Sequence, residues 1–116
     1  MFKKIKYFIQ RGRRGFSDED LWDFSYYLSN TICEGIKEFR KDISGYPSGM
    51  TPEKWAEVLV SIEDGFKVAL TISDRSLTVI GKDGKIEFND ELYADYMKRF
   101  NKAMDLFKKY YFGIWD

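Results

Sequence analysis

Three stretches of the chain carry large apolar residues spaced three and four apart, and this periodicity limits the fold more than any other feature. Such spacing puts side chains on one face of an α-helix, so each stretch predicts a helix with one buried face. The clearest begins at Thr51 and Pro52, an N-cap and a first-turn proline, and extends to about residue 73. Its apolar stripe consists of Trp55, Val58, Leu59, Ile62, Phe66, Ala69 and Leu70. We therefore expect this helix to lie in the core.

The stretch RGRRGFSDEDLWDFSYYL, residues 11–28, changes from arginines to carboxylates and then to large apolar residues. Ser17 and Asp20 have the spacing of a capping box, and acids at 18–20 suit the positive end of a helix dipole. We interpret the change as a helix start, with the helix ending near residue 42. Gly35 is expected to mark close approach by a neighbouring helix. The predicted core face consists of Leu21, Phe24, Leu28, Ile32, Ile36 and Phe39.

Between residues 76 and 88, two short β-favouring segments flank Asp83 and Gly84, a pair that favours a tight turn, so we expect a β-hairpin insertion. Asn89 then caps a third long helix. The expected fold class is mainly α: a bundle of three long helices, a short N-terminal helix over residues 2–11 and the hairpin insertion. We expect residues 1–116 to form one domain. The apolar residues of the third helix are Tyr93, Met97, Phe100, Met104, Phe107 and Tyr111.

The composition argues against common catalytic sites. The chain has no histidine and a single cysteine, Cys33, so usual zinc ligands, catalytic bases and an internal disulfide are missing. Acids four apart occur as pairs along the predicted helices, and we interpret them as solvated surface rather than metal ligands. We expect no enzyme activity, no metal and no cofactor. These pairs are Glu19 and Asp23, Glu53 and Glu57, and Glu91 and Asp95.

Charge is distributed unevenly along the chain. Residues 1–14 contain six Lys and Arg residues and no acid; because the formal net charge is zero, residues 15–116 carry −6. We favour a basic arm that docks on carboxylates of the body or stays solvated, with nucleic acid or an anionic membrane surface as alternatives. Arg11, Arg13 and Arg14 are candidate phosphate-binding residues. No apolar run is long enough to span a bilayer, and we expect a soluble cytoplasmic protein without a membrane partner.

Aromatic residues are abundant, with ten Phe, eight Tyr and three Trp. The tryptophans can be core anchors or centres of a binding surface, and core is the favoured interpretation. Tyr110, Tyr111 and Phe112 are consecutive and cannot all face one core, so at least one is expected to be exposed or to contact another chain, such as a second copy in a homodimer. The candidate binding aromatics are Trp22, Tyr26, Tyr46, Trp55 and Tyr110.

The segments RGFSDEDLWDFSYYL, GYPSGMTPEKW and LFKKYYFGIWD together resemble a family of small uncharacterised proteins encoded by bacteriophages and prophages. The resemblance covers residues 7–70 and 93–116, and the closing Ile114-Trp115-Asp116 is a mild departure from a Leu-Trp-Asp ending. It implies a location in the cytoplasm of an infected bacterial host cell. It assigns no catalytic role to any residue.

Three classes of function follow as hypotheses. We prefer a non-catalytic phage accessory protein that binds a host or defence-system protein through its aromatic and acidic surfaces. The second is an anti-defence protein that sequesters a nucleotide signal, with Arg11, Arg13 and Arg14 holding phosphate. The third is a nucleic-acid-associated protein that uses the basic arm, with binding that falls steeply as salt rises.

Overall fold

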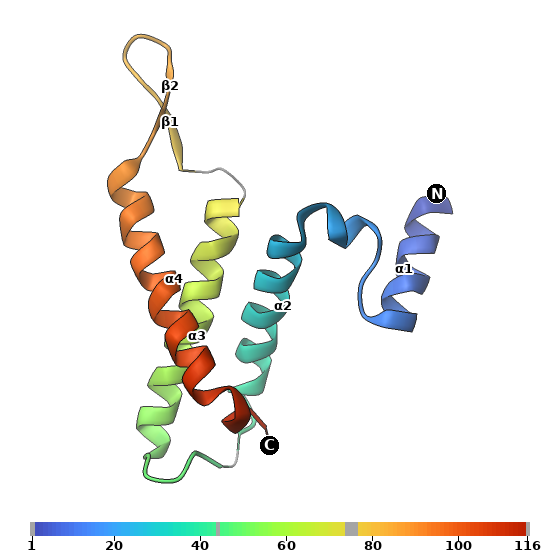
Figure 1. Cartoon of the computed structure of the whole chain (residues 1–116), viewed down its shortest axis with the longest axis vertical. Helices are drawn as coiled ribbons and strands as arrows, with labels where there is room; N and C mark the ends of the chain where they lie inside the picture. Colours follow the sequence, from blue (N-terminus) through green and yellow to red (C-terminus); the bar gives the residue numbers. More distant parts are fainter. Residues whose placement is uncertain (1, 44, 74–76, 116) are drawn as a thin grey trace.

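The computed structural model of the chain describes residues 2–43, 45–73 and 77–115, and it is mainly helical as predicted (Figure 1). The bounds of its elements, in chain order, are α1 Phe2–Arg14, η1 Glu19–Asp23, α2 Phe24–Phe39, α3 Pro52–Ser73, β1 Thr78–Ile80, β2 Ile86–Phe88, α4 Asp90–Tyr110 and η2 Tyr111–Gly113. The two η elements are short 3-10 helices.

Helix α3 lies between α2 and α4 and packs against both (Figure 1). Its predicted stripe forms the centre of the core, because Leu59 and Ile62 are completely buried and Trp55 is 1 % exposed. The predicted helix starts are confirmed at Thr51, whose Oγ1 accepts the Lys54 N–H at 3.1 Å, and at Asn89. Phe66 of the same stripe also belongs to the core, and the neighbouring helices contribute Cys33, Ile36 and Ala103.

Gly65 brings α3 and α4 close together. A Cβ at this position would lie 2.1 Å from the Ala103 Cβ and 2.8 Å from the Arg99 carbonyl oxygen. Beside this crossing, the Arg99 Nε donates to Asp64 Oδ2 at 2.9 Å, which joins the same two helices on their exposed side. The close contact between α3 and α4 therefore depends on a residue that has no side chain.

The prediction for Gly35 is wrong, because a Cβ built there meets no atom within 4 Å. The predicted core face of α2 is also wrong in its first half. Ile36 is buried, but Leu21, Phe24 and Leu28 are exposed. The second half of the stripe does face the core, since Ile32 and Phe39 pack against it, and the buried side of α2 also includes Ser29 and Cys33.

Strands β1 and β2 pair antiparallel, with Val79 opposite Glu87 in the register. Gly84 in the connecting turn has φ +79°, a left-handed conformation that favours glycine. Ile80 and Ile86 are exposed, and the strands extend beyond the ends of α3 and α4 (Figure 1). Ser76, the first residue of the predicted 76–88 insertion, lies outside the described residues.

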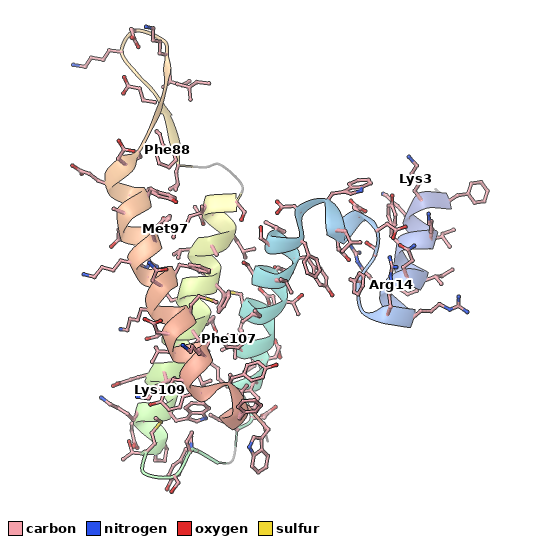
Figure 2. All side chains as sticks on the ribbon, in the orientation of Figure 1. Lys3, Arg14, Phe88, Met97, Phe107 and Lys109 are labelled. Carbon is pink, nitrogen blue, oxygen red and sulfur yellow. The ribbon has the colours of Figure 1, made fainter. Side chains whose placement is uncertain are left out.

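Helix α1 stands apart from the three packed helices (Figure 1). Figure 2 shows it between Lys3 and Arg14, beside the loop that leads to α2. The radius of gyration is 17.5 Å, whereas a compact domain of this length has about 13 Å. The projecting α1 and strands account for this extended shape. Among the described residues, no helix is both long enough and apolar enough to cross a membrane.

Candidate functional site

The junction between α1 and α2 is built from the sequence that changes from arginines to carboxylates. Gly15 has φ +87° and donates its N–H to the Arg11 carbonyl at 2.9 Å, which ends α1 and reverses the chain. Ser17 and Asp20 then form the predicted capping box: the Ser17 N–H donates to Asp20 Oδ2 at 2.7 Å and the Asp20 N–H to Ser17 Oγ at 3.2 Å. The box starts η1, and a second cap, Asp23, starts α2.

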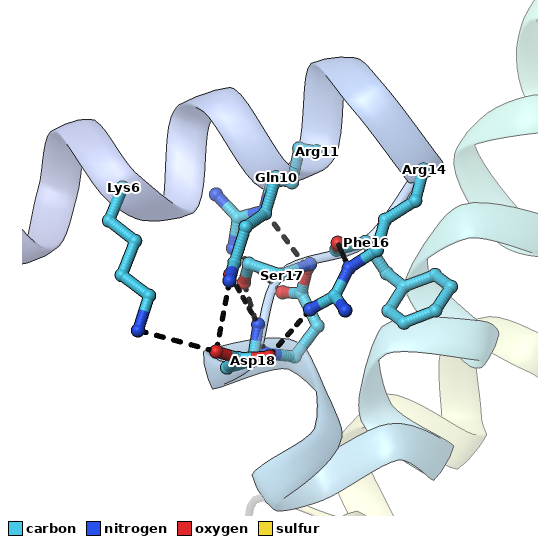
Figure 3. A network of polar contacts seen from close by, with 8 residues as sticks. Lys6, Gln10, Arg11, Arg14, Phe16, Ser17 and Asp18 are labelled. Carbon is cyan, nitrogen blue, oxygen red and sulfur yellow. Dashed lines mark hydrogen bonds and ion pairs between the residues drawn. The ribbon is translucent and has the colours of Figure 1, made fainter.

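Polar contacts hold one face of α1 against this loop (Figure 3). Gln10 Nε2 donates to Asp18 Oδ2 at 2.9 Å, and Arg14 Nη2 donates to Asp18 Oδ1 at 2.6 Å. Arg11 donates two hydrogen bonds to Asp20, from Nε to Oδ2 at 3.0 Å and from Nη2 to Oδ1 at 2.7 Å. Two of the three candidate arginines therefore pair within the chain, as the favoured interpretation of the basic arm predicted.

The same contacts change the acidity of the two carboxyls. The Gln10 hydrogen bond, followed by that of Arg14, lowers the pKa of Asp18 from 3.8 to about 2. The Arg11 hydrogen bond holds the pKa of Asp20 well below its usual range, and Asp20 in turn raises the pKa of Arg11. Both carboxylates therefore stay charged at neutral pH.

Acidification is expected to release the contacts of Asp18. Because folding lowers the pKa of Asp18, these contacts contribute fully to stability above its ordinary pKa of 3.8. That contribution is lost as the pH falls through about 2. The side-chain amide signal of Gln10 in an NMR titration should shift over this range, while that of Asn101 on α4 serves as the control. A Gln10 signal that stays constant, or that moves well above pH 3.8, contradicts the expectation.

A cavity of about 550 Å³ opens beside this junction. Trp22 is its most exposed aromatic residue, at 74 %, and its ring meets Tyr7 of α1 edge to face at a centroid distance of 6.2 Å. Tyr27 donates its hydroxyl to the Gly15 carbonyl, which ties α2 to the end of α1. The residues that line the cavity are Arg11, Glu19, Asp20, Trp22, Asp23, Tyr26, Tyr27 and Asn30.

The electrostatics of this cavity are acidic. Three carboxylates line it against the single guanidinium of Arg11, which Asp20 already holds. Asp23 accepts the Tyr26 N–H at 3.3 Å and the Ser25 hydroxyl at 3.1 Å. Within the described parts of the chain, neither Glu19 nor Asp23 takes part in an ion pair. Both carboxylates therefore stand next to exposed aromatic rings without a paired cation, although Glu19, after the Asp20 hydrogen bond, also raises the pKa of Arg11.

Of the candidate binding residues, the structure gathers Arg11, Trp22 and Tyr26 around one cavity. Arg14 pairs with Asp18 on the other side of the loop, and Arg13 is exposed on α1. The cavity residues outside that candidate set are Glu19, Asp23, Tyr27 and Asn30. Glu19, Asp23 and Asn30 lie three or four positions from Trp22 or Tyr26, a helical spacing that could have identified them. The acids had instead been explained by the helix start and as solvated surface.

Three further candidates lie elsewhere. Trp55 is buried in the core, which corrects its place among the candidate binding residues, and Tyr110 is half-buried edge to face against it at a centroid distance of 5.7 Å. Tyr46 is exposed in the loop between α2 and α3. Phe112 is 90 % exposed, so the aromatic run 110–112 does include a ring outside the core, as predicted.

Metal binding and similarity to known proteins give no further assignment. Among the described residues, no group of three or more His, Cys, Asp or Glu side chains is placed to hold a metal ion. Comparisons with protein-family models, with curated proteins and with solved structures give no match. The phage-protein resemblance therefore stays a prediction.

Proposed function

We propose that the chain is a non-catalytic, phage-encoded accessory protein that binds a host or defence-system protein. In this proposal the cavity beside the α1–α2 junction receives a Lys or Arg side chain of the partner. The observation that carries it is the exposed Trp22 standing in one cavity with the carboxylates of Glu19 and Asp23.

Cation recognition suits this combination of groups. The faces of Trp and Tyr rings carry negative electrostatic potential, and a Lys or Arg head over them is attracted by about 0.5–2 kcal/mol. A carboxylate beside the ring adds a charge-assisted hydrogen bond. Trp and Tyr are also the residues that most often dominate protein interfaces. Trp22 and Tyr26 would supply the apolar contact, and Glu19 and Asp23 would supply the charge.

A phosphate-bearing ligand fits the same cavity less well. The nucleotide alternative needs Arg11, Arg13 and Arg14, yet Asp20 and Asp18 already hold the first and the last of these. A phosphate would have to displace a carboxylate from its arginine and approach an acidic lining. The nucleic-acid alternative meets the same competition at Arg11 and Arg14.

The single cysteine also favours a binding protein over an enzyme. Cys33 is buried in the core, and burial raises the pKa of its thiol. Thiol nucleophiles usually need the opposite environment, a partly exposed site that stabilises the thiolate.

The test is affinity purification of the tagged protein from phage-infected bacterial cells, with co-purifying proteins and nucleotides identified by mass spectrometry. We expect a stoichiometric protein partner that the Trp22→Ala variant loses. Trp115→Ala is the matched control, since Trp115 is 76 % exposed and Trp22 is 74 % exposed. With the purified partner, Trp22→Ala should weaken binding at least about tenfold, or 1.4 kcal/mol.

A charge-reversal variant distinguishes binding at the cavity from nonspecific adsorption of partners to the exposed aromatic rings. Glu19→Lys should abolish binding, because the new cation would occupy the cavity and repel a Lys or Arg of the partner. The variant should still fold, since the Glu19 side chain caps no helix. Retention of a nucleotide without any protein would overturn the proposal. So would a partner that binds Trp22→Ala and Glu19→Lys as tightly as the wild type.

A further inference from the structure

Helix α1 exposes a set of large apolar side chains that the fold leaves uncovered. Phe2 and Phe8 are 88 % and 77 % exposed, and Ile5 and Ile9 are each about half exposed. No described residue of α1 is buried. Isolated exposed apolar residues are ordinary on a protein surface, but four on one short helix form a contiguous patch.

These four residues lie on a single face of the helix. Phe2, Ile5 and Ile9 follow steps of three and four, and Phe8 lies one turn from Ile5. The opposite face carries Gln10, Arg11 and Arg14, which hold the loop at Asp18 and Asp20 (Figure 3). Because that opposite face is fixed to the body, the apolar face points away from it, and the chain's own core cannot cover it.

The charges of α1 are arranged around this face. The helix has six basic residues and no acid. Lys6, Arg11 and Arg14 pair with Asp18 or Asp20, whereas in the described part of the chain Lys3, Lys4 and Arg13 form no ion pair. Helical periodicity places Lys4 and Arg13 at opposite borders of the apolar face. Both borders thus carry a long side chain whose charge is available.

We propose that α1 binds in the plane of an anionic membrane surface. Phe2, Ile5, Phe8 and Ile9 enter the boundary between headgroups and acyl chains, while Lys4 and Arg13 extend outward to lipid phosphates. A short basic helix with one apolar face is suited to this interfacial position and needs no spanning length. The expectation of no membrane partner rested on the lack of a spanning segment, a criterion that does not apply to such a helix.

The arrangement favours a flat lipid surface over the other candidates. A groove on a protein would bury Lys4 and Arg13 together with the apolar residues, whereas a lipid interface leaves both charges among phosphates and water. Nucleic acid would engage the cations but leave the apolar face uncovered. The acidic body, with −6 over residues 15–116, would be repelled by the same lipids, and the chain reversal at Gly15 keeps it separate from the apolar face.

The test is sedimentation of the full chain with vesicles of phosphatidylcholine alone and of an equal mixture with phosphatidylglycerol. We expect the partition coefficient to be at least about tenfold higher on the anionic vesicles and to fall with added salt. The double variant Ile5→Glu and Phe8→Glu should abolish this binding. The control is Ile80→Glu with Ile86→Glu, two exposed isoleucines on the paired strands away from α1, and this variant should bind like the wild type.

Lys4→Gln with Arg13→Gln should lower the preference for anionic vesicles several-fold and leave the fold intact.

The membrane proposal does not depend on the cavity, so the Glu19→Gln variant should bind vesicles as the wild type does. It is overturned if anionic vesicles sediment no more protein than neutral ones, or if both double glutamate variants bind equally. It is also overturned if light scattering without lipid shows a dimer that Ile5→Glu dissociates, or if salt-sensitive DNA binding is found without vesicle binding.

Discussion

Replacing Trp55 by alanine is expected to lower the free energy of unfolding by about 3–5 kcal/mol, the largest effect we expect of any single change. Trp55 is 1 % exposed at the first turns of the central helix, where it meets Tyr110 edge to face at a centroid distance of 5.7 Å. Its removal leaves a cavity that neighbouring helices can close only in part. Urea unfolding followed by circular dichroism measures the change.

Trp115→Ala is the control for that experiment. Trp115 has the same side chain but is largely exposed, so its loss should change stability by about 0.5 kcal/mol or less. Equal destabilisation by the two variants would contradict the position of Trp55 in the core.

Gly65→Ala is expected to have the second large effect, lowering the free energy of unfolding by about 1–3 kcal/mol. A methyl group there would meet the Ala103 Cβ at 2.1 Å and the Arg99 carbonyl at 2.8 Å, and neither belongs to a flexible side-chain end. Helices α3 and α4 would have to move apart, which weakens the contacts of Phe66 with Phe100 and Phe107. Thermal unfolding should show a lower midpoint.

Gly35→Ala is expected to change the free energy of unfolding in the opposite direction and serves as the control. Gly35 lies inside α2 with open space around it, so alanine should stabilise the helix by up to about 1 kcal/mol. A Gly65→Ala variant as stable as the wild type would show that the two helices are not in close contact.

These two glycines mark a limit of inference from sequence. A glycine within a helical pattern either is merely tolerated by the helix or allows a second helix to approach closely. Only the position of the neighbouring helix distinguishes the two cases. Gly35 was expected to be the contact, yet the contact is at Gly65 opposite Ala103. The helix starts at Thr51 and Asn89 were predictable because caps act within one turn, and both side chains accept the expected backbone N–H. Ser17 also accepts the expected N–H, but it starts only the short η1, and the long helix predicted from there begins at Phe24 with Asp23 as its cap.

The apolar stripe of α2 shows a second limit. Periodicity tells which side chains share a face, but it does not tell whether a neighbouring element covers them. Phe24 stacks on Tyr27 at a centroid distance of 5.8 Å and meets Phe16 at 6.3 Å, in a cluster at the junction rather than in the core. The stripe of α3 was predictable because its helix has neighbours on two sides.

The candidate cavity was predictable only in pieces. Arg11, Trp22 and Tyr26 were identified separately, as a phosphate ligand and as aromatic anchors. Their meeting depends on the chain reversal at Gly15 and on the pairing of Arg11 with Asp20, which brings the end of α1 beside the start of α2. A contact between residues nine positions apart, across a turn, has no periodic signal.

The position of α3 between two helices also sets how the molecule opens. Helices α2 and α4 each pack against α3, whereas α1 contacts the loop that follows it and η1. Local opening of α1 or of the paired strands thus leaves the buried centre intact, whereas opening of α3 requires both neighbours to detach. We therefore expect backbone amides of α3 to exchange their hydrogens through global unfolding, and those of α1 through local opening that leaves the rest of the chain folded.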